Sequence, residues 1–414
     1  MSYIVLAIPV FFLLIGVELV VLRLQEKDGY YRLTDSINDL SCGTIQQLLD
    51  VFLKTALFAG YVLVYERLRV FSLPNESAAA WVACFLGVDF FYYWFHRTSH
   101  EVNAIWAAHV VHHQSEEYNL AVALRQGAFQ GVFSWAFYLP LALLGFPPVM
   151  FLTLSSFNTL YQFWIHTRAI GRLRPLEWVL NTPSNHRVHH GRNPKYIDKN
   201  HGGTLIVWDR LFGTYKEEGE EPVFGITTPL RSWNPVWANL HYWVEIFGKA
   251  RRARRLRDKL AFFWKPPGWH PEEMGGFAAP PEVDRATYRK FDTAVPPGLA
   301  VYAFVQFVLL LVAAVVFLFE QDAFGAPARA AGAVAVIVSL VTLAGLLERK
   351  AWALPLETAR LGLAAIVAGL ASAATGVALP AVAAVLAAPF LFWLLRYRSS
   401  FSVGGAIADG SGAA

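Results

Sequence analysis

Histidine is concentrated in one part of this chain, and each concentration adjoins a long apolar segment. Nine of the 12 histidines lie between positions 96 and 190. They form a pair, two clusters of three and one single residue: His96 and His100; His109, His112 and His113; His186, His189 and His190; and His166. Neutral imidazole is the commonest metal ligand among side chains. Two metal ions with about four ligands each need this many nitrogens, so we predict a two-metal site in a membrane protein.

The spacing within each cluster suits a helix that presents its imidazoles on one face. His96 and His100 are one helical turn apart, and in both clusters of three the first histidine precedes the others by three and four residues. Before the last cluster, Thr182 is a favoured cap residue and Pro183 suits the first helical position, while Gly191 suits the exit. We therefore expect a short helix there that carries three ligands.

A single helical pair of histidines is weak evidence for a metal, because water or a backbone carbonyl also satisfies a histidine at a membrane interface. Several such groupings, all next to apolar segments, favour metal binding. A structural zinc site takes four ligands, often cysteines, whereas this set holds about twice as many and no cysteine. That difference favours two metals with open positions. Imidazole binds iron, zinc and copper alike, so the spacing leaves the metal open.

The composition is that of an all-α integral membrane protein. Hydrophobic residues make up 55% of the chain and charged residues only 16%, against about 25% charged in soluble domains. A helix needs roughly 20 apolar residues to cross a bilayer. Hydropathy predicts about nine spans, at 4–22, 48–65, 81–95, 128–144, 149–165, 299–319, 330–347, 361–379 and 380–395. We interpret the first as an anchor rather than a cleavable signal, because no basic stretch precedes it.

The basic residues predict the orientation, because loops rich in lysine and arginine stay cytoplasmic. With the N-terminus outside, the crossings place the basic clusters inside, except Arg67 and Arg69. The same crossings put the nine histidines on the cytoplasmic side. The arginine-rich segment 251–257 is either a patch for anionic lipid headgroups or an ordinary cytoplasmic loop, which we favour. It lacks a nucleic-acid motif, so we predict no nucleic-acid partner.

We expect three regions along the chain: a membrane-embedded catalytic domain at 1–298, a C-terminal transmembrane helical region at 299–398 and a flexible tail at 399–414. The first boundary follows Pro296 and Pro297, which separate the histidine-rich part from a part without histidine. The preceding stretch, 265–297, is rich in proline and glycine and suggests an irregular connection. Cys42 and Cys84 lie in or near apolar segments, so they do not suggest a disulfide framework.

The order of the histidine motifs, His-x3-His, His-x2-His-His, a lone His and His-x2-His-His, resembles the fatty acid hydroxylase/sterol desaturase superfamily. Its members are integral-membrane, non-haem di-iron enzymes. Within it, the chain is most similar to the alkylglycerol monooxygenase family, in FHRTSHE, HHQSEEYNLAVALRQ, YQFWIHT, NTPSNHRVHHGRNPKYIDKN and GGTLIVWDRLFGTY. The resemblance is specific over 89–215. It implies two iron ions, with ligands at His96, His100, His109, His112, His113, His186, His189 and His190, and His166 as a ninth.

Other polar residues near the histidines have several interpretations. The resemblance implies a catalytic role for Glu101, which matches an acidic residue of the alkylglycerol enzymes. Asp89 lies two helical turns before His96, where a carboxylate can hydrogen-bond a ligand's second nitrogen or simply pair with a base, and an intramembrane acid is a functional candidate. His201 stands where the family pattern KN-x-GG has an aromatic residue, so we leave it out of the metal site. A last set forms either a layer around the ligands, a cofactor pocket or a solvated loop: Glu116, Glu117, Asn119 and Arg125.

We therefore predict an O2-dependent oxidoreductase that hydroxylates a membrane lipid held in an apolar tunnel. The resemblance implies attack beside the ether oxygen of an alkylglycerol, with tetrahydrobiopterin or another electron donor as reductant. The alternative within the superfamily is a sterol or fatty acyl hydroxylase or desaturase. Two other classes are a transporter, which needs polar or broken helices inside several spans, and a histidine-rich zinc scaffold.

Overall fold

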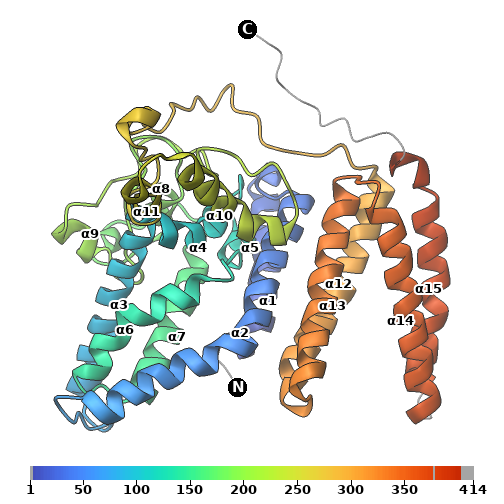
Figure 1. The fold of residues 1–414 in the computed structure, drawn as a ribbon, viewed down its shortest axis with the longest axis horizontal. Helices are drawn as coiled ribbons and strands as arrows, with labels where there is room; N and C mark the ends of the chain where they lie inside the picture. The colour runs from blue at the N-terminus through green and yellow to red at the C-terminus, as the bar shows by residue number, and fades with distance from the viewer. Residues whose placement is uncertain (1–2, 376–377, 402–414) are drawn as a thin grey trace. The chain divides into compact units, whose positions relative to one another are not determined.

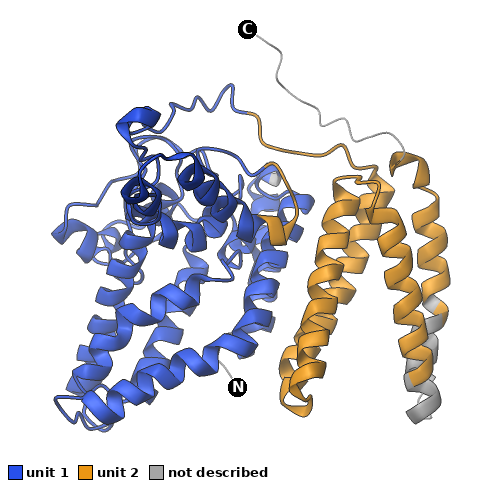
Figure 2. Cartoon of the chain, viewed as in Figure 1, with its two compact units in different colours: residues 1–230, 238–288 blue, residues 231–237, 289–414 orange. Residues whose placement is uncertain are grey.

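The structure is a computed structural model that describes residues 3–375 and 378–401. Within these ranges the secondary structure is helical (Figure 1), apart from isolated bridges between Leu180 and Leu205 and between Gly191 and Phe224. The chain forms two compact units (Figure 2), one of residues 1–230 and 238–288 and one of residues 231–237 and 289–414. The all-helical class expected from the sequence is confirmed.

The first unit combines long helices with a set of shorter ones gathered at one end of them (Figure 1). The long helices are α1 (Tyr3–Leu24), α2 (Leu33–Leu68), α3 (Ala78–Glu101), α6 (Gln130–Leu143) and α7 (Pro148–Trp164). The helices gathered at their end are shorter, except α10 with 18 residues: α4 (Asn103–His113), α5 (Leu120–Ala123), α8 (Pro183–His189), α9 (Val207–Leu211), α10 (Pro235–Arg252) and α11 (Leu256–Trp264). Helix α10 begins in the segment that is grouped with the second unit.

Six helices of the described chain are long and apolar enough to cross a membrane, so the protein is a multi-pass membrane protein. They are Leu6–Leu24, Leu33–Leu68, Ala78–Glu101, Pro297–Ala323, Ala326–Leu347 and Ala353–Leu370. Helices α6 and α7, which we expected to be spans, have 14 and 17 residues, fewer than the roughly 20 that a crossing needs. The count of about nine spans therefore stays a prediction.

The hairpin of α6 and α7 turns at Gly145, a position that only glycine fits. Its φ is +91°, and a Cβ atom there would lie 1.9 Å from the carbonyl oxygen of Phe71. Next to this turn, the hydroxyl of Tyr61 in α2 donates to the carbonyl oxygen of Phe146 at 3.0 Å. The core beneath it joins α2, α3, α6 and α7 through Tyr61, Ala80, Cys84, Val88, Leu141, Ala142, Phe146 and Met150.

The second unit is built from α12 (Pro297–Glu320), α13 (Ala326–Leu347), α14 (Ala353–Thr375) and α15 (Ala378–Leu395). A buried polar contact joins α12 to α14: the hydroxyl of Tyr302 donates to Glu357 at 2.6 Å, and Arg360 donates to both Glu357 and Gln306 at 2.6 Å. Of the tail expected at 399–414, the first residues belong to η5 (Arg398–Phe401), and residues 402–414 lie outside the described chain.

Candidate metal centre

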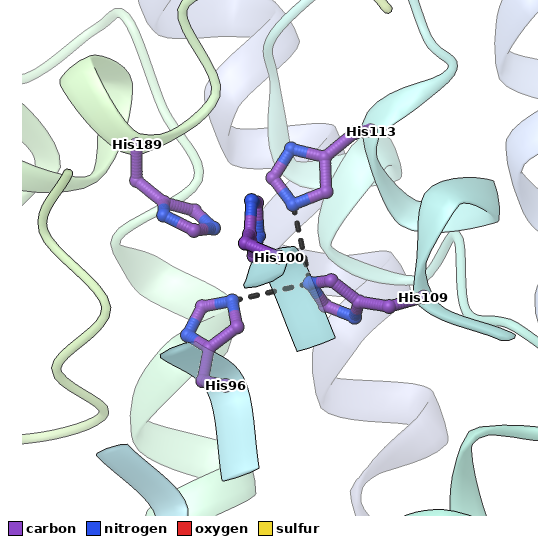
Figure 3. Close-up of side chains that lie close together, drawn as sticks. All are labelled: His96, His100, His109, His113 and His189. Carbon is purple, nitrogen blue, oxygen red and sulfur yellow. Dashed lines mark hydrogen bonds between the residues drawn. The ribbon is translucent and has the colours of Figure 1, made fainter. Parts of the chain in front are cut away.

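The structure brings all nine clustered histidines together in two buried groups. The five-histidine group is His96, His100, His109, His113 and His189, and the four-histidine group is His112, His166, His186 and His190. Within each group the candidate ligand atoms lie within 4.8 Å of one another. In Figure 3 the five imidazoles of the first group surround a common space. Both groups therefore have the composition and closeness that a metal ion requires.

The two groups interleave because neighbouring histidines point to different sides of a helix. His112 and His113 are consecutive in α4, and consecutive residues are about 100° apart around a helix, so each contributes to a different group. His189 at the end of α8 and His190 just after it divide in the same way. The start of α8 is as predicted, since Pro183 is its first residue and the Thr182 side chain caps it.

Oxygen acceptors hold many of the imidazoles in one tautomer. An amide or peptide oxygen can only accept a hydrogen bond, so the nitrogen facing it carries the proton and the other nitrogen carries a lone pair. The nitrogens held in this way are Nδ1 of His96 by the His201 carbonyl (2.8 Å), of His109 by Gln130 Oε1 (2.8 Å), of His112 by the Arg125 carbonyl (2.8 Å), of His166 by the Gln162 carbonyl (2.7 Å) and of His189 by the Lys199 carbonyl (2.9 Å).

In each group, two of these Nε2 atoms face each other with their lone pairs. Nε2 of His96 lies 3.1 Å from Nε2 of His109, and Nε2 of His112 lies 3.2 Å from Nε2 of His166. Without a proton between them, two nitrogen lone pairs at this distance repel. Two nitrogens bound at right angles to one metal, each at about 2.1 Å, are about 3 Å apart. The donor sets therefore fit a metal ion in each group.

Burial keeps these imidazoles in the neutral form that binds metal. Desolvation lowers the pKa of His109 from 6.5 to about 3 and that of His166 to about 4. For His112, His189 and His190, burial and then the neighbouring imidazoles lower the pKa well below its usual value. At pH 7 these rings are therefore uncharged, and protons compete little with a metal.

Asp89 is fully buried in α3, and its carboxylate binds the loop before α9. Both oxygens accept hydrogen bonds, from Asn158 Nδ2 (2.7 Å), Thr204 N (2.7 Å), Leu205 N (3.1 Å) and Trp208 Nε1 (2.9 Å). These donors are the partners of its carboxylate, in place of the two alternatives drawn from the sequence, a ligand imidazole or a basic side chain. Asp89 therefore fixes the C-terminal end of the loop 199–205, through the backbone of Thr204 and Leu205.

Asp209 in α9 fixes an earlier part of the same loop. Its carboxylate accepts hydrogen bonds from the backbone nitrogens of His201 and Gly202, both at 2.7 Å, and from the hydroxyl of Thr214 at 2.6 Å. The loop in turn provides the carbonyls that accept from His96 and His189. Burial raises the pKa of Asp209 to about 6, while the three hydrogen bonds that the carboxylate accepts act in the opposite direction and favour its charged form. Asp209 was not among the residues predicted from the sequence, although an acid inside the apolar stretch IVWDRLF was a usable signal.

The four polar residues that follow the second cluster do not form a solvated loop, because Glu116, Glu117, Asn119 and Arg125 are all buried. Arg125 donates to the Val111 carbonyl (2.6 Å), Gln114 Oε1 (2.7 Å), Asn38 Oδ1 and Asp39 Oδ1 (3.1 Å). Its own carbonyl accepts from His112. The guanidinium therefore fixes the backbone that orients a histidine of the four-histidine group.

Two other candidates lie at the edge of the centre. Glu101 is the last residue of α3 and its side chain is 46% exposed; it accepts a hydrogen bond from Arg97 at 2.8 Å. His201 lies outside both groups of ligand atoms, yet it is fully buried, and its ring centroid is 5.1 Å from that of His100 and 5.5 Å from that of His189. A histidine that is isolated in the sequence thus borders the five-histidine group.

Comparison with known proteins agrees with this arrangement. The model of the fatty acid hydroxylase family matches residues 81–214, which contain all nine histidines. The chain is 39% identical over 367 residues to alkylglycerol monooxygenase from Homo sapiens, covering 87% of this chain and 81% of that enzyme. It is 40% identical over 362 residues to the enzyme of the same name from Xenopus tropicalis, covering 87% and 80%.

A weaker similarity extends to other lipid enzymes. The chain is 30% identical over 128 residues to an ornithine lipid hydroxylase from Rhizobium tropici, covering 31% of this chain and 39% of that protein. No solved structure matches the chain. The length and identity of the alkylglycerol monooxygenase matches decide the assignment. The chain belongs to the alkylglycerol monooxygenase family of fatty acid hydroxylases, and it is a membrane-bound, O2-dependent oxidoreductase that acts on lipids.

Proposed function

We propose that this protein is a di-iron monooxygenase that cleaves the ether bond of alkylglycerols, with tetrahydrobiopterin or another two-electron donor as reductant. The observation that carries the metal centre is the pair of buried groups in which imidazole lone pairs face each other, at His96 and His109 and at His112 and His166. The relatives named alkylglycerol monooxygenase support the substrate. The nine clustered histidines are the proposed ligands.

These histidines would hold two iron ions, which when bound would supply the O2-dependent oxidation of a C–H bond. The carbonyls of residues 199 and 201 keep the Nε2 atoms of His189 and His96 directed inward, and burial of the rings excludes water from the reaction. In an alkylglycerol, the ether oxygen stabilises a radical or cation on the carbon beside it, so that carbon is the easier target. Hydroxylation there gives a hemiacetal, which breaks into a fatty aldehyde and glycerol.

Asp89 and Glu101 have different roles in this proposal. Asp89 acts as a positioning residue through the loop that it binds. Glu101 is the proposed catalytic carboxylate, which the similarity to the alkylglycerol enzymes supports. Its exposed pair with Arg97 contributes only about 0.3–0.5 kcal/mol to stability, so a Glu101→Gln variant is expected to fold and to retain its metals. Loss of turnover in that variant then reports on chemistry alone.

We also propose that the histidine groups face the cytoplasm, within a catalytic domain at 1–298 that a C-terminal helical region at 299–398 follows, and that the chain crosses the membrane about nine times. The basic end of α10, with Lys249, Arg251 and Arg252 in its last turn, supports this orientation because basic loops stay cytoplasmic.

The substrate is tested by product analysis. Purified protein loaded with iron is incubated with a 1-O-alkylglycerol, tetrahydrobiopterin and O2, and mass spectrometry is used to detect fatty aldehyde. We expect aldehyde from the wild-type protein and none from a His189→Ala control. Absence of aldehyde from a protein that does hydroxylate a sterol or a fatty acid would assign it to the other branch of the superfamily.

A further inference from the structure

The side chain of His201 lies beside the five-histidine group but is neither a proposed metal ligand nor part of the proposed reaction. It is fully buried, and neither ring nitrogen has a hydrogen-bond partner of normal geometry. Its ring centroid lies 5.1 Å from that of His100, 5.5 Å from that of His189 and 5.7 Å from that of His96. Three members of the five-histidine group are therefore its neighbours.

The backbone of His201 is fixed from both sides. Its N–H donates to Asp209 at 2.7 Å, and its carbonyl accepts from His96 at 2.8 Å. The following residues, Gly202 and Thr204, are bound by Asp209 and Asp89. Because the backbone cannot shift easily, the ring is held beside the five-histidine group.

An imidazole in this position is unfavourable unless something binds it. A neutral ring has one N–H donor and one acceptor nitrogen, and a buried polar group without a partner costs about 1–3 kcal/mol. A metal would satisfy Nε2 of His100 and of His189, which also lack partners, but His201 is not among the nitrogens grouped around that metal position. The backbone of Asp198 interacts with the ring, but not as a regular hydrogen bond, and it can serve only one of the two nitrogens, so the other nitrogen is left for a partner from outside the chain.

A metal with five nitrogen ligands still has one position open in an octahedral arrangement, and catalytic metal sites keep such a position for water or substrate. We propose that His201 forms a hydrogen bond with a small exogenous ligand in the open position of the five-histidine metal, and so determines how tightly that ligand binds. This proposal rests on the proposed metal centre. It adds a tenth histidine whose role is to contact the ligand rather than the metal.

Azide is a suitable probe, because it binds metals and accepts hydrogen bonds. Wild-type protein and a His201→Phe variant, which keeps the ring shape without nitrogens, are loaded with iron, their metal content is measured, and azide binding is followed by absorbance. His201→Gln keeps a hydrogen-bond donor and serves as the conservative variant. His270→Phe is the matched control, because His270 bonds to the Gly268 carbonyl and lies outside both groups.

We expect His201→Phe to keep two metals and to bind azide about tenfold more weakly, the effect of one hydrogen bond of about 1.4 kcal/mol. His201→Gln should recover part of that affinity, and His270→Phe should match the wild type. Equal azide affinity in wild type and His201→Phe, or no azide binding to the wild type, overturns the proposal. Loss of one metal from His201→Phe also overturns it, because His201 would then be a metal ligand. If His201→Phe does not fold, a His201→Leu variant takes its place. Azide affinity equal to that of the wild type in both His201→Leu and His201→Gln then overturns the proposal. Absence of metal from the wild type would instead reject the proposed metal centre.

Discussion

Nε2 of His96 lies 3.1 Å from Nε2 of His109, and neither atom carries a proton to share. Each ring already donates from Nδ1, His96 to the His201 carbonyl and His109 to Gln130. His112 and His166 repeat the relationship in the four-histidine group at 3.2 Å. Both contacts are favourable only when a cation lies between the nitrogens, which indicates one metal in each group. Removal of a ligand from one group should therefore release the metal of that group.

The first prediction concerns single ligands. His189→Ala removes a ligand of the five-histidine group, and His112→Ala removes one of the four-histidine group. Each variant should stay in the membrane, lose turnover to the detection limit and bind about one metal fewer than the wild type. Elemental analysis and the aldehyde assay measure both effects, and His270→Ala is the control. Two tightly bound metals in both variants would show that the groups have been assigned wrongly.

A second prediction concerns the loop that carries the acceptor carbonyls. Asp209 accepts three hydrogen bonds on two oxygens, whereas asparagine has one acceptor oxygen. Asp209→Asn should loosen the loop and weaken one of the two metals by about 10–100-fold. Chelator titration measures this affinity, and Glu245→Gln, which breaks a partly exposed pair with Lys249, is the matched control. Unchanged affinity for both metals would mean that the loop does not position the ligands.

A third prediction concerns stability. Arg125 is buried and pairs with the buried carboxylate of Asp39 at 3.1 Å. Arg125→Met leaves that carboxylate without its cation, and breaking a buried pair costs about 3–5 kcal/mol. We expect a lower midpoint of thermal unfolding and less monodisperse protein in detergent. The exposed Arg251→Met serves as control, and equal midpoints for the two variants would contradict the role given to Arg125.

A fourth prediction concerns orientation. A cysteine at the exposed position of Arg254 should resist a membrane-impermeant thiol reagent in intact cells and react after lysis. The two native cysteines are free and buried, so they should give little background. Labelling of intact cells would place the histidine groups on the outer side.

Local features of the site were predictable from the sequence, because helical spacing and capping depend on neighbouring residues. The cap at Thr182 and the start of α8 at Pro183 are where the sequence placed them. The division into five and four histidines was not predictable, since it depends on which helix each imidazole faces after packing. The same applies to His201, which is isolated in the sequence and joins the site only through the loop that Asp209 holds.

The lengths of the helices α6 and α7 were also only partly predictable from the sequence. The sequence predicted two consecutive apolar segments, at 128–144 and 149–165, where the structure has the hairpin of α6 and α7. The predicted segment 149–165 and helix α7 both have 17 residues, whereas α6 has 14 residues and is shorter than the predicted segment 128–144. That segment begins before α6 because Ala128 is apolar and buried without being helical, and its backbone N–H donates to Asn239 Oδ1 at 2.8 Å. Hydropathy alone does not distinguish a buried loop residue from a membrane-spanning one.

The most direct test of the two-metal centre is the metal content of the purified protein. Protein reconstituted with iron and freed of excess metal is analysed by inductively coupled plasma mass spectrometry, with the chain concentration determined by amino-acid analysis. The arrangement of the nine histidines in two buried groups predicts two metal ions per chain. One ion per chain, or none, would contradict it.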